Sequence, residues 1–500
     1  MNLNRRQFIQ TSVLAVAALP LTSFGADRAG AKFAQHLTGR VVASAGLPVR
    51  ANQRTPFGWQ TTTVTTADQT PLRLAWPGLA AGVVPTHFRI AVGLDERDEK
   101  MVEVFLPASG RVLGTMDLRF VTQFQIYELP LRPADVTAIR SEGLALRLTK
   151  GSDLEIFTGG DSMPAALLPH LLVPGTAGVM DEYFARMDSL ACVQQFGWME
   201  GCVLDGLLDL STLPAHAHLR KTAQQHLSLF FKDGRLVYEN QVSAPSDDKL
   251  YGIEGGTPFG ALARVEPQSA LPDLAINFWK SCKRPNGSIQ DGRQMTSEGA
   301  HTIGYALAEI ARARQSEALM NEALYQVRIR QARFFDGQEF WRVYHDDGHR
   351  TNRNWARGIA WQILGLARTL RVAKDRSDIA DLIITLQRFA AWIITFQRAG
   401  GLWSEFVDEP TLTPDTAGSA GIAAALAIGA QQGWLDAKAT AAARKTLAGL
   451  QAHLTLDGFL CGVSQSNKGG EGLQRSDYRC IYQMGMGLMA QLIAALGGRT

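Results

Sequence analysis

Three glutamates lie where buried helices are expected to begin, and each has a glycine close by in the sequence. They are Glu200, Glu254 and Glu298. Carboxylates that face one another across a pocket raise one another's pKa, so one of them stays protonated near neutral pH and can donate a proton. Cleavage of a glycosidic bond needs such a pair. We predict that Glu298 is the general acid/base and Glu254 its partner, while Glu200 contacts substrate. The alternative is a charge that only complements a helix dipole.

An arginine and two tryptophans mark a further helix start, in the segment 354–361. Arg357 and Trp361 are spaced to share one helix face. A planar guanidinium binds a carboxylate through two parallel hydrogen bonds, and an indole offers a flat face to a sugar ring. We therefore expect Arg357 to anchor an acidic sugar between Trp355 and Trp361. An internal ion pair of Arg357 is the competing interpretation.

Other polar and aromatic residues near these helix starts are expected to complete the substrate site. They are Trp198, His301, His345, Trp403 and Ser419. For the two histidines and Trp403, packing in the protein interior is the alternative. A metal site at 345–347 is not favoured because the stretch lacks a helical pair of histidines. We expect no metal.

Long amphipathic helices must position these residues. Helical spacing of apolar residues predicts them at 180–193, 198–212, 217–231, 254–265, 269–284, 297–314, 317–335, 353–371, 376–399, 415–432, 436–455 and 480–497. Every second one is apolar nearly all round, which is typical of an inner helix, whereas its neighbours carry a polar face. We expect six hairpins closed into an (α/α)6 toroid, a mainly α fold with all inner starts at one mouth. A helical glycine costs about 1 kcal/mol relative to alanine, so the glycines at these starts suggest close approach of substrate.

The residues before these helices follow a different pattern. Residues 35–165 contain short segments rich in β-branched and aromatic residues, separated by turn residues, which predicts a small antiparallel β-sandwich. The lengths and spacing of the predicted strands resemble those of galactose-binding-like sandwiches. Both glycan binding and a purely structural role stay open. Residues 166–178, rich in proline and glycine, are predicted to be a linker, and 179–500 to be the catalytic barrel.

The composition and the first residues of the chain indicate its partners and its localisation. A net charge of +3 with 19% charged residues gives no indication of a nucleic-acid or membrane-surface partner. The five cysteines lack metal-site spacing and are interpreted as small buried hydrophobes. Two arginines, Arg5 and Arg6, precede an apolar run at 9–21. Residues 1–31 therefore resemble a twin-arginine signal, cleaved between Gly25 and Lys32, which implies the twin-arginine translocation machinery as partner and a periplasmic or exported protein. An uncleaved anchor is the alternative.

Four segments of the helical part resemble the unsaturated glycuronyl hydrolases of glycoside hydrolase families 88 and 105. They are 198–201, 355–361 (similar to W-A/G-R-G-x-x-W), 401–403 followed by 407–410, and 415–420 (similar to E-T/A-S-G-S-A). The resemblance covers about residues 195–497. It implies an (α/α)6 fold without a redox cofactor. It also implies removal of a terminal 4,5-unsaturated uronic acid, by protonation of the enol ether and addition of water at C5.

One departure from those families bears on the chemistry. Where they carry two aspartates, this chain carries Glu254 and Glu298. The extra methylene moves each acid outward, and a displacement of about 1 Å can cost on the order of a hundredfold in rate. Three alternatives therefore stay open: a saturated β-uronidase on the same scaffold, a polysaccharide lyase using a Tyr/His pair (Tyr344 with His345, or Tyr251 with His301), or a non-catalytic glycan-binding protein. The oligomeric state is not predicted.

Overall fold

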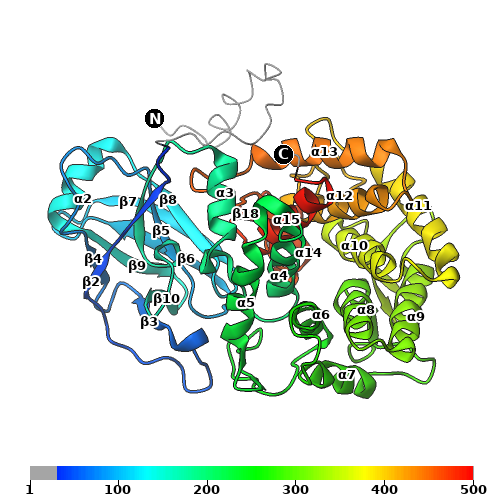
Figure 1. Cartoon of the computed structure of the whole chain (residues 1–500). Coiled ribbons are helices and arrows are strands. Elements are labelled where there is room, and N and C mark those ends of the chain that lie inside the picture. The colour runs from blue at the N-terminus through cyan, green and yellow to red at the C-terminus, as the bar shows by residue number, and fades with distance from the viewer. Residues whose placement is uncertain (1–30, 499–500) are drawn as a thin grey trace.

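The structure is a computed structural model that describes residues 31–498. Figure 1 shows strands gathered on one side of the molecule and helices on the other, so the described chain is of mixed content. The predicted export signal lies outside the described residues, except for its last residue. No helix within 31–498 combines the length and the apolar character that crossing a membrane requires.

The strand-rich part is built from antiparallel pairs, as predicted. One sheet has the order β1 (Gln35–Thr38), β11 (His170–Val173), β5 (His87–Ala91), β8 (Ile126–Pro130). The second has the order β2 (Arg40–Ala43), β4 (Leu72–Ala75), β9 (Leu144–Lys150), β6 (Glu99–Phe105), β7 (Val112–Arg119), and β3 (Gln60–Thr65) pairs separately with β10 (Asp153–Gly159). Side chains from the two larger sheets share one apolar core that includes Phe88, Val104 and Leu146. A short helix, α2 (Val136–Glu142), joins β8 to β9.

The segment predicted to be a linker is instead part of this sheet. Within 166–178, strand β11 pairs with β1 on one side and β5 on the other, and Leu171 and Leu172 are fully buried. The flanking prolines, Pro169 and Pro174, therefore bound a central strand. The linker prediction is wrong because Pro and Gly mark the ends of a buried strand as well as the ends of a domain.

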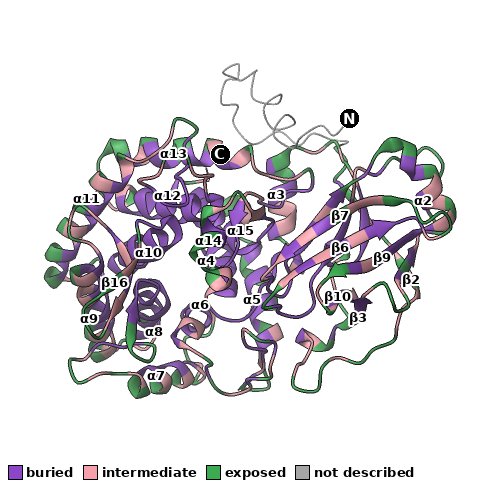
Figure 2. Ribbon diagram, turned by 180° about the vertical axis from the view of Figure 1, so that it is seen from behind, coloured by how far each residue is buried: buried purple, intermediate pink, exposed green. Residues whose placement is uncertain are grey.

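The helices alternate between buried and half-exposed members, as predicted. The inner set is α4 (Trp198–Leu210), α6 (Thr257–Val265), α8 (Ala306–Ala313), α10 (Ala356–Val372), α12 (Thr416–Gln431) and α15 (Met484–Ala495). The outer set is α3 (Val179–Met187), α5 (Leu219–Phe230), α7 (Pro272–Ser281), α9 (Glu317–Phe334), α11 (Ala380–Ile394) and α13 (Ala437–Gln451), with a short α14 (Gly470–Arg475) before α15. Figure 2 shows the contrast between the buried inner helices and the exposed faces of α9, α11 and α13.

Each inner helix packs against the next around a closed circuit. Contacts run from α4 to α6, α8, α10, α12 and α15, and from α15 back to α4. The first outer helix is tied to the last inner one, since the Tyr183 hydroxyl donates to the backbone oxygen of Met486 at 2.8 Å. Parallel inner helices thus bring residues distant in sequence to the same end of the circuit.

The glycines near the inner helix starts serve contacts between helices. A Cβ on Gly201 would lie 2.4 Å from the Cβ of Thr257, and one on Gly299 would lie 2.3 Å from the guanidinium of Arg330. Real side chains do not approach so closely, so the backbones pack together only because these positions lack a side chain. Protein atoms rather than substrate therefore account for Gly201 and Gly299, and close approach of substrate at the other helix starts stays a prediction.

Buried polar contacts join the strand-rich part to the helices. Asp457, in the loop after α13, lies 2.7 Å from a guanidinium nitrogen of Arg89 and 2.7 Å from the ring of His36. Burial opposes its charge, but Arg89 and His36 outweigh burial and hold the pKa of Asp457 well below its usual range. Gln125 and Gln465 also pair across this boundary, at 3.1 Å. The strand-rich part is therefore fixed to one end of the helical circuit.

Candidate active site

Two of the three predicted glutamates come together. Glu254 lies in the 3₁₀ turn Ile253–Gly256 before α6, and Glu298 lies between β14 (Gln294–Thr296) and the π-helical turn Ala300–Tyr305 that leads into α8. Burial raises the pKa of Glu254, and the charge of Glu298 raises it further. Glu254 can therefore hold a proton at a pH where an exposed glutamate is ionised.

A cation that was not predicted lies beside this pair. Arg342 is on β15 (Trp341–His345), the middle strand of a three-stranded sheet with β14 and β16 (Arg350–Arg353). Its Nε donates to Glu298 Oε1 at 2.5 Å. With the Asn467 amide turned so that its oxygen accepts, both terminal nitrogens of Arg342 lie 3.1 Å from that oxygen. Its guanidinium also covers the ring of Trp355, 5.4 Å from the ring centroid.

The sequence contained a signal for Arg342. Residues 341–345 and 350–353 flank an Asp-Asp-Gly turn, which is typical of a β-hairpin. From this segment we predicted only His345 as a substrate ligand. In the structure, the ring of His345 stacks on that of His349 at 4.3 Å, and Arg342 and His345 face opposite sides of the strand because side chains alternate along it. The structure does not bring His345 to the glutamate pair.

A cavity of about 280 Å³ opens beside Glu254. It is lined by Phe196, Gly197, Trp198, Tyr238, Asn240, Gln241, Tyr251, Gly252, Glu254, Gly255 and Asp291. Gln241 Nε2 donates to Glu254 Oε2 at 3.0 Å. Trp198 is half-buried, and its ring meets that of Trp361 edge to face at 5.2 Å. Aromatic walls, an amide and an acid in a concave site suit a sugar ring.

Arg357 does not have the predicted role. Its side chain is buried, and its Nε donates to Asp415 Oδ2 at 3.1 Å. Its terminal nitrogens donate to the backbone oxygens of Ser464 at 2.6 Å and Gln465 at 3.3 Å. Arg357 thus forms the internal ion pair that was the competing interpretation. It fixes the start of α12 to the loop that precedes Asn467.

Trp355 and Trp361, on either side of Arg357 in the sequence, are also buried. Trp355 lies between Arg342 and Arg357, with the Arg357 guanidinium 5.6 Å from its ring centroid. Its indole Nε1 donates to Glu405 Oε1 at 2.8 Å. Trp361 lies behind Trp198, one layer from the cavity. Substrate contact by these two rings stays a prediction.

Glu200 is buried and is not among the residues that line the cavity, and its contact with substrate stays a prediction. The residue is fully buried, and its Oε1 lies 2.8 Å from Nδ1 of His226 on the outer helix α5. Despite burial, the charge of Glu200 raises the pKa of His226 to about 10. Glu200 thus forms a buried ion pair between an inner and an outer helix.

Trp403 and Ser419 are also interior residues. Trp403 is fully buried, and its indole Nε1 donates to the backbone oxygen of Ile393 at 2.8 Å. Its backbone nitrogen donates to the Ser419 hydroxyl at 2.9 Å. Trp403 is packed in the interior, which was the alternative for it, and contact of either residue with substrate stays a prediction.

His301 lies beneath the cavity, in the π-helical turn. It is fully buried with its ring 5.7 Å from that of Trp361. Within residues 31–498 neither ring nitrogen has a hydrogen-bond partner, and Nε2 lies 3.8 Å from an oxygen of Asp205. Burial lowers the pKa of His301 to about 3, so the ring is neutral at pH 7. Contact of His301 with substrate stays a prediction.

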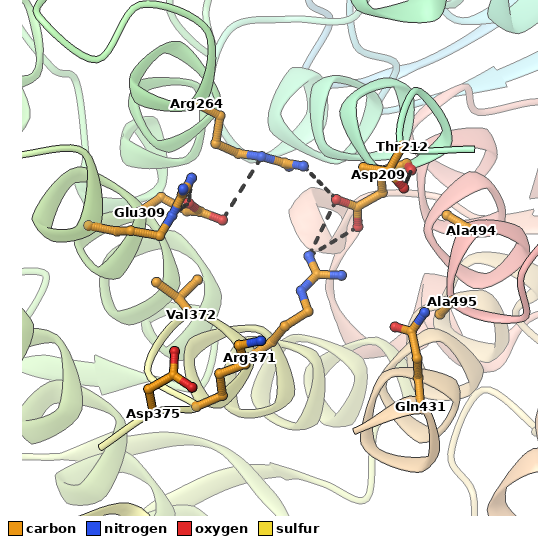
Figure 3. A pocket seen from close by; sticks show the side chains of 12 residues that line it. Asp209, Thr212, Arg264, Glu309, Arg371, Val372, Asp375, Gln431, Ala494 and Ala495 are labelled. Carbon is orange, nitrogen blue, oxygen red and sulfur yellow. Dashed lines mark hydrogen bonds and ion pairs between the residues drawn. The ribbon is translucent and has the colours of Figure 1, made fainter. Parts of the chain in front are cut away.

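A second cavity, of about 380 Å³, lies where the inner helices end (Figure 3). Arg264 and Arg371 converge there on Asp209, at 2.7 and 3.3 Å. Burial opposes the charge of Asp209, but the arginines outweigh it and hold its pKa below the usual range. Helix C-termini carry partial negative charge that nearby cations compensate. These charges are therefore accounted for by the fold, and the pair of Glu254 and Glu298 lies at the starts of the inner helices, not at their ends.

Across 31–498, no group of three or more His, Cys, Asp or Glu side chains is arranged to hold a metal ion.

Comparison with known proteins gives one family and a set of related folds. Residues 293–495 match the model of Glycosyl Hydrolase Family 88, which confirms the resemblance stated from the sequence. A glycoside hydrolase from family 105 of C. acetobutylicum ATCC 824 matches with a TM-score of 0.53 and 17% identity, over 64% of this chain and 98% of that chain. A possible family 105 member from Salmonella enterica matches with a TM-score of 0.52 and 18% identity, over 61% and 83%.

A structure described as a polysaccharide lyase is also similar, with a TM-score of 0.51 and 14% identity over 64% of this chain and 95% of that chain. No curated protein matches the sequence. At these identities the structural matches show the fold alone, because one fold hosts different reactions. The reaction must be argued from the site.

Proposed function

We propose that this glycoside hydrolase, whose residues 293–495 are of the family 88 type, removes a terminal 4,5-unsaturated uronic acid from acidic oligosaccharides. The observation that carries the proposal is a glutamate with a raised pKa, Glu254, facing a second glutamate, Glu298, that is paired with Arg342. The six inner helices would form an (α/α)6 toroid with this site at its mouth. A reaction that needs one protonated and one ionised carboxyl fits the pair.

The two carboxyls take different roles in this proposal. Glu254 gives its proton to C4 of the enol ether, while Glu298 accepts a proton from the water that adds to C5. The resulting hemiketal opens and releases the remaining oligosaccharide as an alcohol. The roles are the reverse of those predicted from the sequence, because burial favours the protonated form of Glu254 whereas Arg342 compensates the charge of Glu298.

Arg342 supports an acidic substrate. It takes the place expected for Arg357, as the cation that a uronate carboxylate would meet beside the catalytic pair. Its side chain is 13% exposed, so it is reachable yet shielded from bulk water, where an ion pair is stronger. A guanidinium also suits a carboxylate better than an ammonium does, because it donates two parallel hydrogen bonds.

The size of the cavity supports action at a chain end. A volume of about 280 Å³ is just below the range typical of small-molecule sites. It suits one terminal sugar rather than several consecutive ones. Tyr251, which is 56% exposed at the rim, is placed to contact the next sugar.

The test uses unsaturated oligosaccharides released by polysaccharide lyases. Purified protein should make their enol-ether absorbance fall, and Glu254→Gln and Glu298→Gln should each abolish the fall while the fold is retained. Release of uronic acid from a saturated aryl uronide, with no effect on the enol ether, would replace the proposal with an ordinary β-uronidase. New ultraviolet absorbance from intact polymer would indicate a lyase. Binding without turnover would indicate a glycan-binding protein.

We also propose export through the twin-arginine pathway, which rests on Arg5, Arg6 and the apolar run at 9–21. A reporter protein fused behind residues 1–40 should reach the periplasm. The double substitution Arg5→Lys and Arg6→Lys should retain it in the cytoplasm. Equal export of both fusions would refute this part of the proposal.

A further inference from the structure

The strand-rich part contacts one loop of the helical part at many points. This loop, residues 237–252, lies between β13 (Arg235–Leu236) and the turn that carries Glu254. From the strand-rich side, the backbone nitrogen of Arg54 donates to the Ser243 oxygen at 2.9 Å, and Gln53 Nε2 donates to the Val242 oxygen at 3.1 Å. Arg54 also forms ion pairs with Glu239 and Asp247 of the loop.

The contacts continue at the tip of the loop. The backbone nitrogen of Asp95 donates to the Ser243 hydroxyl at 2.8 Å, and Gln123 Nε2 donates to the same hydroxyl at 3.1 Å. Ser243 has a φ of 58°, a conformation that non-glycine residues seldom adopt and that surrounding contacts must maintain. The loop is therefore held in its shape by residues of the strand-rich part.

This loop presents Gln241 to the catalytic acid. The Gln241 side chain donates to Glu254 Oε2 at 3.0 Å, while its backbone oxygen accepts a hydrogen bond from the Arg97 guanidinium. Arg97 comes from the loop between β5 and β6 of the strand-rich part. One residue of the barrel thus connects Arg97 directly with Glu254.

Asp95 of the strand-rich part fixes a second residue, Lys468. Asp95 is fully buried at its side chain and forms an ion pair with Lys468 at 2.7 Å. Lys468 is 10% exposed and close enough to Glu254 for their charges to interact. Gln195 Nε2 donates to Asp95 Oδ2 at 2.5 Å and fixes the carboxylate that holds Lys468.

We propose that the strand-rich part, residues 35–173, is a working component of the active site. Through Arg97 it holds Gln241 against Glu254, and through Asp95 it holds the charge of Lys468 nearby, and so keeps this acid in place for proton transfer. Arg97 and Asp95 are positioning residues, since they act through Gln241 and Lys468. The inference rests on the proposed function and assigns to the strand-rich part a role other than glycan binding.

Charges on several elements face Glu254, and their signs define the test. Glu298 and Asp291 raise the pKa of Glu254, whereas Arg342 lowers it, and the hydrogen bond from Gln241 lowers it too. Burial lowers the pKa of Lys468 while Asp95 favours its charged form, and the charged form acts on Glu254 in the same direction as Arg342. Loss of Lys468, or release of Gln241 by loss of Arg97, therefore leaves the acid protonated to a higher pH.

The experiment measures kcat against pH on an unsaturated uronide for four full-length variants. Arg97→Ala and Lys468→Met should lower kcat about threefold to tenfold. They should also shift the alkaline limb of the pH profile to higher pH, by about half a pH unit or more. Lys468→Arg should restore the wild-type limb. The matched control is Arg147→Ala, which removes an ion pair with Glu103 between β6 and β9 of the same part, and its limb should stay unchanged.

Arg97 is exposed, so its variant is expected to fold, and unchanged thermal unfolding checks this. Suppose that the wild type turns over uronides, but the alkaline limbs of the pH profiles of Arg97→Ala and Lys468→Met coincide with that of the control. The inference is then overturned and the proposed function stands. If the wild type turns over no uronide, the proposed function fails and the inference fails with it.

Discussion

Replacing Arg342 by glutamine tests whether this cation recognises the substrate carboxylate. Hydrogen bonds to a charged group contribute about 1.5–3 kcal/mol, and each 1.4 kcal/mol corresponds to a factor of about ten. Because Arg342 is only 13% exposed, solvent screening removes little of this. We expect kcat/KM on an unsaturated uronide to fall about 10- to 150-fold in Arg342→Gln.

The assay compares the free acid with its methyl ester, which keeps the ring and loses the negative charge. Arg342 also pairs with Glu298, and that effect lowers activity on both substrates alike. The informative quantity is therefore the ratio of kcat/KM for acid to ester, which should fall about tenfold or more. Arg342→Lys should retain part of the ratio, because it keeps the charge without the planar fork.

The control is Arg353→Gln on the neighbouring strand β16. Arg353 also pairs with a glutamate, Glu339, but both side chains are largely exposed, and such pairs contribute about 0–1 kcal/mol. Its acid-to-ester ratio should match that of the wild type. An equal loss on acid and ester in Arg342→Gln would show that Arg342 only positions Glu298.

Three further predictions follow from charged groups. Activity should fall as pH rises through the raised pKa of Glu254, and Glu254→Gln should lower kcat about 10²- to 10⁴-fold; a flat profile to high pH would contradict its role as acid. Asp457→Asn should cost about 3 kcal/mol in urea unfolding at pH 7, because it removes the buried partner of Arg89 and leaves this buried cation only the partly exposed Glu128. Since the folded pKa of Asp457 is depressed, this contribution is present above the unfolded value of about 3.9 and is lost as pH falls below it; a constant difference down to pH 2 would refute this. His226 has a raised pKa of about 10, so its stabilisation is complete below the unfolded value of about 6.5 and is lost as pH rises towards 10. Unfolding of His226→Gln should lack that dependence, and an unchanged pH profile would count against the ion pair with Glu200.

The helices and the glutamate pair were predictable because both depend on local patterns. The spacing of apolar residues indicated which helices are buried on all sides. The starts of these inner helices then brought Glu254 and Glu298 to the same end. The roles of Arg357 and Glu200 were not predictable in this way. Their partners, Ser464 and His226, lie far along the chain or on the opposite face, and local spacing carries no record of such pairings.

Arg342 and strand β11 were missed for a related reason. Strand β11 lies beside β1 and β5, which are remote in sequence, whereas Arg342 belongs to a short strand that pairs with the remote β14 as well as with the adjacent β16. Four or five residues between turn signals indicate a loop, a linker or a strand almost equally. Such a segment becomes a strand only if the edge of another strand lies beside it. That edge is formed by remote parts of the chain and exists only in the folded protein.

The closed circuit of inner helices has a consequence for biosynthesis. Helix α15, residues 484–495, lies between α4 and α12 and completes the wall that they share. A nascent chain that stops before it would leave apolar faces of both helices open to water, in a topology rich in long-range contacts that forms slowly. Truncation ahead of α15 should therefore yield an aggregating product, whatever the state of the residues at the mouth.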